Sequence, residues 1–169
     1  EAGLPLVRVA DTTRALADLA RHRRLEAEVP VVAITGSFGK TTTKDLTAAI
    51  LETRGPVLKT EGNLNNQYGL PLSLLRLTPE HTAAVLELGM SAEGELRVLS
   101  RIAGPDLGVI TKVGSAHLEF FGSVDEVAKA TAEIQRWMAY SLRDMAPSYH
   151  SAERRSTVRA SSVRWSSRG

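Results

Sequence analysis

The chain has 169 residues, of which 43% are apolar, and this is enough to bury the core of one domain of ordinary size. It contains no cysteine, which excludes a disulfide framework and a thiolate metal site. The sequence lacks a long apolar run and a basic leader followed by an apolar segment, so neither a membrane span nor a signal peptide is indicated. We therefore expect a cytoplasmic protein without a membrane partner.

The formal net charge of +2 conceals two different compositions. Residues 1–134 carry 14 basic and 17 acidic side chains, whereas residues 135–169 carry seven arginines, two acids, eight serines and both tryptophans. Three interpretations of this basic tail are open: a disordered segment that contacts nucleic acid or acidic surfaces, a segment that folds on a partner, or a sequence out of frame with the natural protein. We favour the last because periodic patterning stops abruptly after residue 134.

Residues 1–28 are expected to connect to a missing N-terminal domain, since the chain does not begin with Met and its first residues form no complete element. A helix is predicted to start with Asp11 or Thr12 as its N-cap and to end before Pro30. Its expected buried face, which extends up to Leu25, consists of Leu16, Leu19, Ala20 and the stem of Arg23.

A phosphate-binding loop is the most informative pattern in the chain. An apolar run from Val29 to Ile34 has the composition of a buried parallel strand and leads into Gly36-Ser37-Phe38-Gly39, Lys40 and Thr41-Thr42, where a helix begins. Glycines let the backbone approach an anion, the helix N-terminus offers unpaired N–H groups, and Lys40 adds a full charge for the outer phosphates. Thr41 would then face Mg²⁺. The alternative is a glycine turn that opens a helix beside an exposed lysine.

An asparagine-rich loop follows the helix, which should end near Arg54, and a short extended piece at residues 57–60. Three asparagines, Asn63, Asn65 and Asn66, lie within four positions, which favours a loop over a helix or strand. This segment is either a simple turn or, beside a phosphate site, a loop that faces the substrate.

Glu87 is the one charged residue of a predicted buried strand at residues 82–88. A carboxylate in such a strand must be paired or bound to a metal. Because ligands gather at the carboxyl ends of parallel strands, Glu87 and Gly36 should lie at the same edge of the sheet. The alternative is an ion pair between Glu87 and a lysine or arginine.

The remaining elements continue the alternation of strands and helices that is typical of an α/β protein with a doubly wound parallel sheet. Helices are expected at residues 70–77, 91–103 and 124–134, the last capped by Ser123, and a strand at residues 107–111. His117 follows that strand and could ligate a metal, bind phosphate or have a purely structural role.

These patterns together resemble the Mur ligases, which are ATP-dependent amide ligases of peptidoglycan precursor synthesis. The resemblance rests on Ile34-Thr35-Gly36-Ser37-Phe38-Gly39-Lys40-Thr41-Thr42, Gly62-Asn63-Leu64-Asn65-Asn66, Leu86-Glu87-Leu88-Gly89-Met90, Pro105-Asp106, Val109-Ile110-Thr111 and Val113-Gly114-Ser115-Ala116-His117-Leu118-Glu119. It implies an incomplete central ATP-binding domain at residues 29–134, with a P-loop-type, mostly parallel sheet flanked by helices and followed by the irregular tail. The asparagine loop followed by Gly69-Leu70-Pro71-Leu72 favours the branch that adds D-alanyl-D-alanine to UDP-N-acetylmuramoyl-tripeptide.

The resemblance also implies roles for individual residues. ATP would phosphorylate the terminal carboxylate of the tripeptide, and the amine of the dipeptide would attack the acyl phosphate. Residues Gly36 to Thr42 would bind the nucleotide, with Lys40 also stabilising the transferring phosphoryl group. Thr41 and Glu87 would hold Mg²⁺, His117 would serve a second metal, and Asn65 and Asn66 would lie near the reacting carboxylate.

Two residues depart from the pattern of the family. Thr131 stands where the family has a lysine that is carbamylated, and Lys112 replaces the asparagine that usually precedes Val113-Gly114. Because the flanking domains also have no counterpart here, we expect a ligase fragment that binds nucleotide or phosphate but is not a competent enzyme alone. The alternative is a non-catalytic nucleotide-binding or interaction module with a basic tail. We do not favour nucleic acid as a partner.

Overall fold

The computed structural model describes residues 6–114 and 122–134 of the chain. Its elements in chain order are α1 (Thr12–Glu26), β1 (Val31–Thr35), α2 (Lys40–Glu52), β2 (Val57–Lys59), α3 (Gly69–Leu74), β3 (Ala83–Glu87), α4 (Glu95–Ala103), β4 (Leu107–Ile110) and α6 (Val124–Thr131). The predictions for residues 135–169 and for His117 lie outside these described residues. No helix in the described ranges is long and apolar enough to cross a membrane.

The four strands form one sheet in the order β2-β3-β1-β4, and every neighbouring pair is parallel. This confirms the predicted α/β fold. The register pairs Ile34 with Glu87 on one side of β1 and with Val109 on the other. The carboxyl ends of the three strands β3, β1 and β4 therefore meet at one edge.

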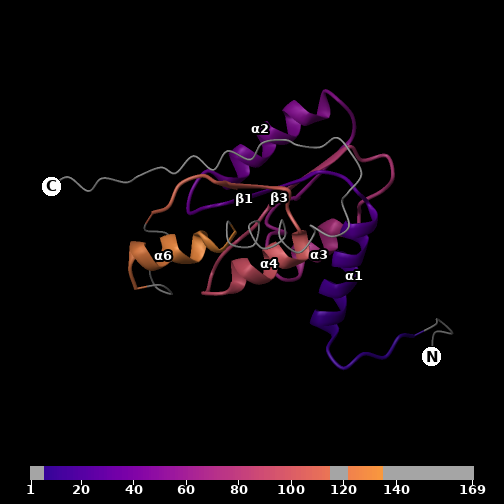
Figure 1. Ribbon diagram of the computed structural model, residues 1–169, viewed down its shortest axis with the longest axis horizontal. Helices are drawn as coiled ribbons and strands as arrows, with labels where there is room; N and C mark the ends of the chain where they lie inside the picture. Colours follow the sequence, from indigo (N-terminus) through magenta and orange to yellow (C-terminus); the bar gives the residue numbers. More distant parts are fainter. Residues whose placement is uncertain (1–5, 115–121, 135–169) are drawn as a thin grey trace, which may run out of the picture.

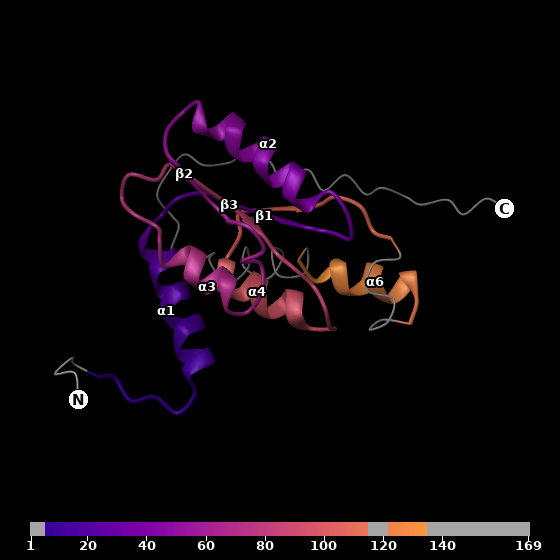
Figure 2. The same cartoon turned by 180° about the vertical axis from the view of Figure 1, so that it is seen from behind.

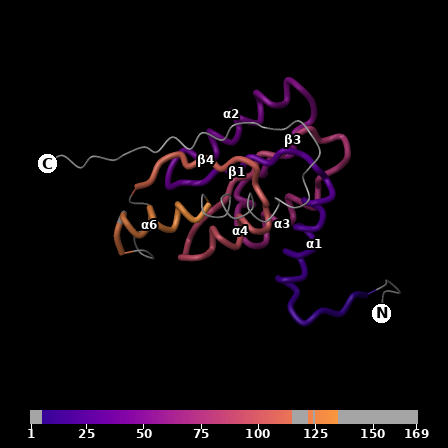
Figure 3. The backbone as a smooth tube through the Cα atoms, in the orientation of Figure 1, coloured from indigo at the N-terminus to yellow at the C-terminus, as the bar shows by residue number. Residues whose placement is uncertain are grey.

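Helices cover both faces of the sheet. Figures 1 and 2 show α2 on one face and the helices α1, α3, α4 and α6 on the other. The backbone trace in Figure 3 places β4 beside β1 on the side of the sheet away from β3.

The alternation of side chains along β1 explains these two layers, because successive residues of a strand point to opposite faces. Ile34 is buried under α2 with Ala48 of that helix and Val85 of β3. Val31 and Ala33 belong to the larger cluster on the opposite face, which includes leucines of α3 and α4. A strand buried on both faces needs the continuous apolar run that the sequence contains.

The expected buried face of α1 was partly wrong. Leu19 is 55% exposed, whereas Ala20 is buried as expected and Arg24 is buried as well. The Arg24 guanidinium donates to the carbonyls of Ala103 and Gly104 over 3.1 and 3.0 Å. The helix therefore turns its arginine rather than its leucines toward the turn between α4 and β4. Asp11 is the N-cap, as predicted, and accepts from the N–H of Arg14.

The start of α4 also differs from the expected helix at residues 91–103. Gly94 has φ +80° in the left-handed region and ends up as the N-cap, so the helix begins only at Glu95. Residues 91–94 are therefore not helical. The N–H of Ser91 donates instead to the Glu95 carboxylate over 2.7 Å. The apolar pattern was preserved, but the backbone conformation of one glycine moved the boundary.

The last described helix, α6, begins after Ser123, whose hydroxyl accepts from the N–H of Glu126 over 3.3 Å. Thr131 is buried, and its hydroxyl donates to the carbonyl of Val127 over 2.7 Å. Glu133 accepts from Arg97 over 2.7 Å, which ties this end of the domain to α4.

Arg24 should be a major determinant of stability, because it bonds carbonyls and also donates to Asp106 over 2.9 Å. We expect Arg24→Met to lower the free energy of unfolding by about 2 kcal/mol, since the buried carbonyls lose a charged donor. Urea denaturation of the 169-residue chain measures this loss. The control is Arg14→Met, which removes an ion pair with Asp18 whose side chains are 82% and 71% exposed; it should cost no more than about 0.5 kcal/mol. Equal losses would contradict the role of Arg24.

Candidate functional site

The candidate site lies at the carboxyl ends of β1 and β3, where the predicted phosphate loop and Glu87 meet. The loop connects β1 to α2, and Glu87 is the last residue of β3. The two strands are neighbours in the sheet, so the sequence correctly predicted that both features share this edge.

Glycine is required at the start of the loop. Gly36 has φ +134°, and a Cβ atom there would lie 2.3 Å from the Thr111 hydroxyl oxygen. Gly39 has φ +83° and is the N-cap of α2, which no side chain caps. The first N–H groups of α2 have no acceptor within the helix, so they remain available for an anion.

The segment after β4 supports this loop through several hydrogen bonds. The N–H of Ser37 donates to the Lys112 carbonyl over 2.6 Å, and the Ser37 hydroxyl accepts from the N–H of Gly114 over 3.0 Å. The Thr111 hydroxyl donates to the Phe38 carbonyl over 2.6 Å. Lys112, which departs from the family pattern, thus contributes a backbone carbonyl while its side chain is exposed.

Lys40 bends back over the loop, and its amine donates to the Gly36 carbonyl over 2.7 Å. The amine therefore lies on the loop itself, as phosphate binding requires. Thr42, another residue that we expect to contact the nucleotide, is exposed in the first turn of α2.

Glu87 is only 3% exposed and accepts two side-chain hydrogen bonds. Its Oε2 accepts from the Thr41 hydroxyl and its Oε1 from the Asn65 amide, each over 2.9 Å. No lysine or arginine in the described ranges forms an ion pair with it, so the alternative proposed from the sequence is not observed there. The carboxylate is instead held by two neutral donors from different segments.

The two asparagines have different surroundings. Asn65 reaches Glu87, and its carbonyl accepts from the N–H of Gly89 over 2.8 Å. A Cβ atom on Gly89 would lie 2.9 Å from the side-chain oxygen of Asn65, so a glycine allows this close approach. The Asn66 side-chain oxygen accepts from the N–H groups of Tyr68 and Gly69 and stabilises the start of α3. A role for Asn66 near a reacting carboxylate stays a prediction.

An exposed ion pair anchors the asparagine loop at its beginning. Glu61 and Arg76 lie 2.7 Å apart, and the hydrogen bond from Arg76 lowers the pKa of the Glu61 carboxyl below its usual value. A lowered folded-state pKa contributes stability above the ordinary pKa, and this contribution is lost on acidification through the folded-state pKa. Both side chains are more than half exposed, so the effect of the pair on stability is small.

The oxygen ligands at Glu87 fit a magnesium ion. Mg²⁺ prefers oxygen and is commonly bound through one or two carboxylates together with phosphates and water. Thr41 and Glu87 offer a hydroxyl and a carboxylate 2.9 Å apart. No group of three or more acidic or histidine side chains that could hold a metal occurs among the described residues. An ion at Thr41 and Glu87 would therefore take further ligands from water or a bound phosphate.

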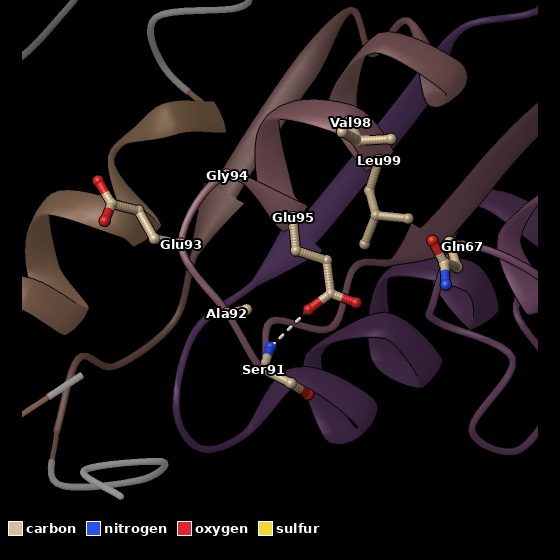
Figure 4. A pocket seen from close by; sticks show the side chains of 8 residues that line it. All are labelled: Gln67, Ser91, Ala92, Glu93, Gly94, Glu95, Val98 and Leu99. Atoms are coloured by element: carbon tan, nitrogen blue, oxygen red, sulfur yellow. Dashed lines mark hydrogen bonds between the residues drawn. The ribbon is translucent and has the colours of Figure 1, made fainter. Parts of the chain in front are cut away.

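A separate hollow of about 580 Å³ lies at the start of α4. Figure 4 shows the residues that line it, which are Gln67, Ser91, Ala92, Glu93, Gly94, Glu95, Val98 and Leu99. None of them belongs to the phosphate loop or touches Glu87 through a hydrogen bond. The figure also shows that the Glu95 carboxylate is already engaged by Ser91.

Sequence analysis missed two buried residues beside Glu87, Lys44 and Thr60. Lys44 donates to the Thr60 carbonyl, and the Thr60 hydroxyl accepts from the N–H of Glu87. A signal was available for Lys44, because it precedes the buried Ala48 by four residues and so lies on the inner face of α2.

The requirement for glycine at position 36 gives a test of the loop. Gly36→Ala should lower the free energy of unfolding by about 3 kcal/mol, because it adds an unfavourable φ to an overlap with Thr111. The control is Gly62→Ala, which also has a positive φ but no heavy atom within 4 Å of the added Cβ; it should cost about 1 kcal/mol. Urea denaturation compares the two, and a smaller loss for Gly36→Ala would refute the packing argument.

Solved structures with the same architecture are ligases. MurF from Acinetobacter baumannii superposes with a TM-score of 0.76 and 42% identity, covering 80% of this chain and 31% of that chain. MurF ligase from Thermotoga maritima, solved in complex with ADP, superposes with a TM-score of 0.73 and 41% identity over 78% of this chain and 31% of that one.

Sequence comparisons agree. The UDP-N-acetylmuramoyl-tripeptide--D-alanyl-D-alanine ligase of Escherichia coli strain K12 is 47% identical over 131 residues, which are 78% of this chain and 29% of that protein. The enzyme of the same name from Bacillus subtilis strain 168 is 47% identical over 129 residues, 76% of this chain and 28% of that protein. The chain thus spans about three tenths of the length of these relatives. The model of the Mur ligase middle domain matches residues 34–144, and the chain belongs to the Mur ligase family.

Proposed function

We propose that this chain supplies the nucleotide-binding part of a ligase that joins D-alanyl-D-alanine to UDP-N-acetylmuramoyl-tripeptide at the expense of ATP. The observation that carries the proposal is the buried Glu87 carboxylate, which accepts from Thr41 at the first turn of the phosphate-loop helix. The identity of 47% to ligases of this specificity supports the choice of substrates.

In this reaction an oxygen of the terminal carboxylate of the tripeptide attacks the γ-phosphorus of ATP, and ADP leaves. The amine of the dipeptide then attacks the acyl carbon, an amide bond forms, and phosphate leaves. Negative charge develops on the transferring phosphoryl oxygens, so fixed positive charge and N–H groups favour the step. Lys40 and the N–H groups at the start of α2 would provide these in this chain.

A magnesium ion held by Thr41 and Glu87 would neutralise charge on the phosphates. Asn65 donates to Glu87 over 2.9 Å and so orients the carboxylate toward Thr41. We expect Asn65 and Asn66 to lie near the reacting carboxylate of the substrate, and His117 to serve a second metal. His117 lies outside the described residues, so its role is proposed from the sequence alone.

One observation favours a second candidate, a module that binds nucleotide without completing the ligase reaction. Thr131 stands where the resemblance implies a carbamylated lysine, and its hydroxyl is engaged by the Val127 carbonyl. A threonine cannot supply that additional carboxylate. Because the chain alone is not expected to be a competent enzyme, the candidates are distinguished in a full-length ligase that contains this segment. Phosphate release that requires the tripeptide and the dipeptide together supports the ligase, and its absence supports the binding module.

Nucleotide binding by the 169-residue chain tests the shared part of both candidates. Isothermal titration with ADP and Mg²⁺ should show binding, and Lys40→Ala should weaken it by about tenfold or more because a charged donor to phosphate is lost. Lys59→Ala is the control, since Lys59 is a partly exposed lysine paired with Glu52; its affinity should stay within about twofold. An absence of ADP binding to the folded chain would overturn the proposal.

Glu87→Gln separates the metal from the phosphate site. Magnesium should increase the ADP affinity of the unaltered chain, and this increase should disappear in the variant because the carboxylate charge is gone. Without magnesium, the variant should bind ADP at least as well as the unaltered chain, since a negative charge near the phosphates has been removed. Titrations with Mg²⁺ and with EDTA measure both affinities, and an undiminished magnesium effect would exclude Glu87 as a ligand.

A further inference from the structure

Lys44 and Thr60 form a buried link directly beside Glu87. Lys44 lies in α2 and is 3% exposed, and Thr60 follows β2 and is 1% exposed. The Lys44 amine donates to the Thr60 carbonyl over 2.8 Å. A lysine amine with so little solvent contact must be satisfied by the protein, because an uncompensated buried charge costs several kcal/mol.

Thr60 is in turn fixed to the strand that ends in Glu87. Its N–H donates to the Val85 carbonyl over 3.2 Å, and its hydroxyl accepts from the N–H of Glu87 over 2.9 Å. Thr60 thus bonds β3 at Val85 and at Glu87, the two residues that flank Leu86. Thr60 therefore joins the pairing with β1 in fixing the backbone of Glu87, while Thr41 and Asn65 orient its carboxylate.

The first turn of α2 is attached to these residues at two points. Thr41 and Lys44 are three residues apart and so project from neighbouring positions on the helix surface. Thr41 contacts the Glu87 side chain, and Lys44 contacts the residue that holds the Glu87 backbone. A shift of α2 along the sheet would therefore disturb both contacts.

A methionine would fill the volume of the Lys44 stem without the desolvation cost of an ammonium, so packing alone does not account for a lysine here. Its second contact, to Asp45 over 3.3 Å, involves a carboxylate that is half exposed and contributes little. The specific effect of the amine is to fix the distance between α2 and the end of β2.

We propose that Lys44 and Thr60 are positioning residues, which hold Glu87 and Thr41 in the arrangement that binds the metal of the nucleotide. The inference rests on the proposed roles of Glu87 and Thr41 and extends them to two residues that do not touch the ligand. Residues that orient metal ligands commonly change metal affinity by about tenfold or more when they are replaced.

The test uses the 169-residue chain and the ratio of its ADP affinities with magnesium and with EDTA. Lys44→Met and Thr60→Val should each reduce this ratio by about tenfold, because the two ligands no longer share one geometry. Thr60→Ser keeps the hydroxyl that accepts from Glu87 and should keep the ratio within about twofold. Lys44→Met or Thr60→Val with an unchanged ratio would overturn the proposal.

Arg24→Met is the matched control for Lys44→Met. Both residues are buried cations that donate to backbone carbonyls, but Arg24 bonds the turn before β4, at the opposite end of the strands from the phosphate loop. Both variants should lower the melting temperature, whereas only Lys44→Met should change the magnesium ratio. An equal change in both ratios would show that the effect follows stability rather than position.

A measurement without ligand separates this inference from the proposed function. In nuclear magnetic resonance spectra, the side-chain amide protons of Asn65 and the N–H of Glu87 report their hydrogen bonds directly. Lys44→Met and Thr60→Val should shift both signals and accelerate exchange of the Glu87 N–H, while Arg24→Met should leave them in place. Unchanged signals would refute the positioning role even if the chain binds no ADP, and shifted signals would support it even if magnesium has no effect on the unaltered chain.

Discussion

The buried carboxylate of Glu87 is the constraint on which this edge of the molecule depends. A charged group removed from water must receive hydrogen bonds, or burial costs several kcal/mol. Its two side-chain donors come from separate segments, Thr41 from α2 and Asn65 from the loop before α3. One carboxylate therefore fixes the helix that follows the phosphate loop, the asparagine loop and the end of β3 relative to each other. The same contacts that stabilise the fold assemble the proposed metal ligands.

At the opposite edge of the sheet, where the strands begin, the buried guanidinium of Arg24 is the central group. Arg24 donates to carbonyls of the α4–β4 turn and to Asp106, and the Asp106 carboxylate also accepts from the N–H of Val31 over 2.8 Å. Strong acceptors at this edge thus already have donors within the protein. At the carboxyl edge, the first N–H groups of α2 have no intrahelical acceptor and no capping side chain. This asymmetry leaves one edge closed by its own contacts and the other able to receive an anion.

Periodicity predicted the sheet and most helices because burial on one or two faces leaves a repeating pattern. It could not predict that α1 buries Arg24, since the acceptors of that arginine lie 79 and 80 residues further along the chain. Glu87 was correctly expected at the carboxyl edge of the sheet beside Gly36, but in the sequence an ion pair would have satisfied its carboxylate equally well. Only the spatial arrangement selects Thr41 and Asn65. Lys44 was missed because a lysine in an amphipathic helix is ordinarily assigned to the exposed face.

The contact between Lys40 and the Gly36 carbonyl is compatible with the phosphate binding proposed for the loop. The amine already donates over 2.7 Å to an oxygen of the loop, so it lies over the loop rather than extending into solvent. A phosphate oxygen carries negative charge, so the Lys40 ammonium is attracted to it more strongly than to a neutral carbonyl oxygen. Exchange of one acceptor for the other is therefore favourable. The contacts of Ser37 and Thr111 hold the loop independently of the Lys40 amine.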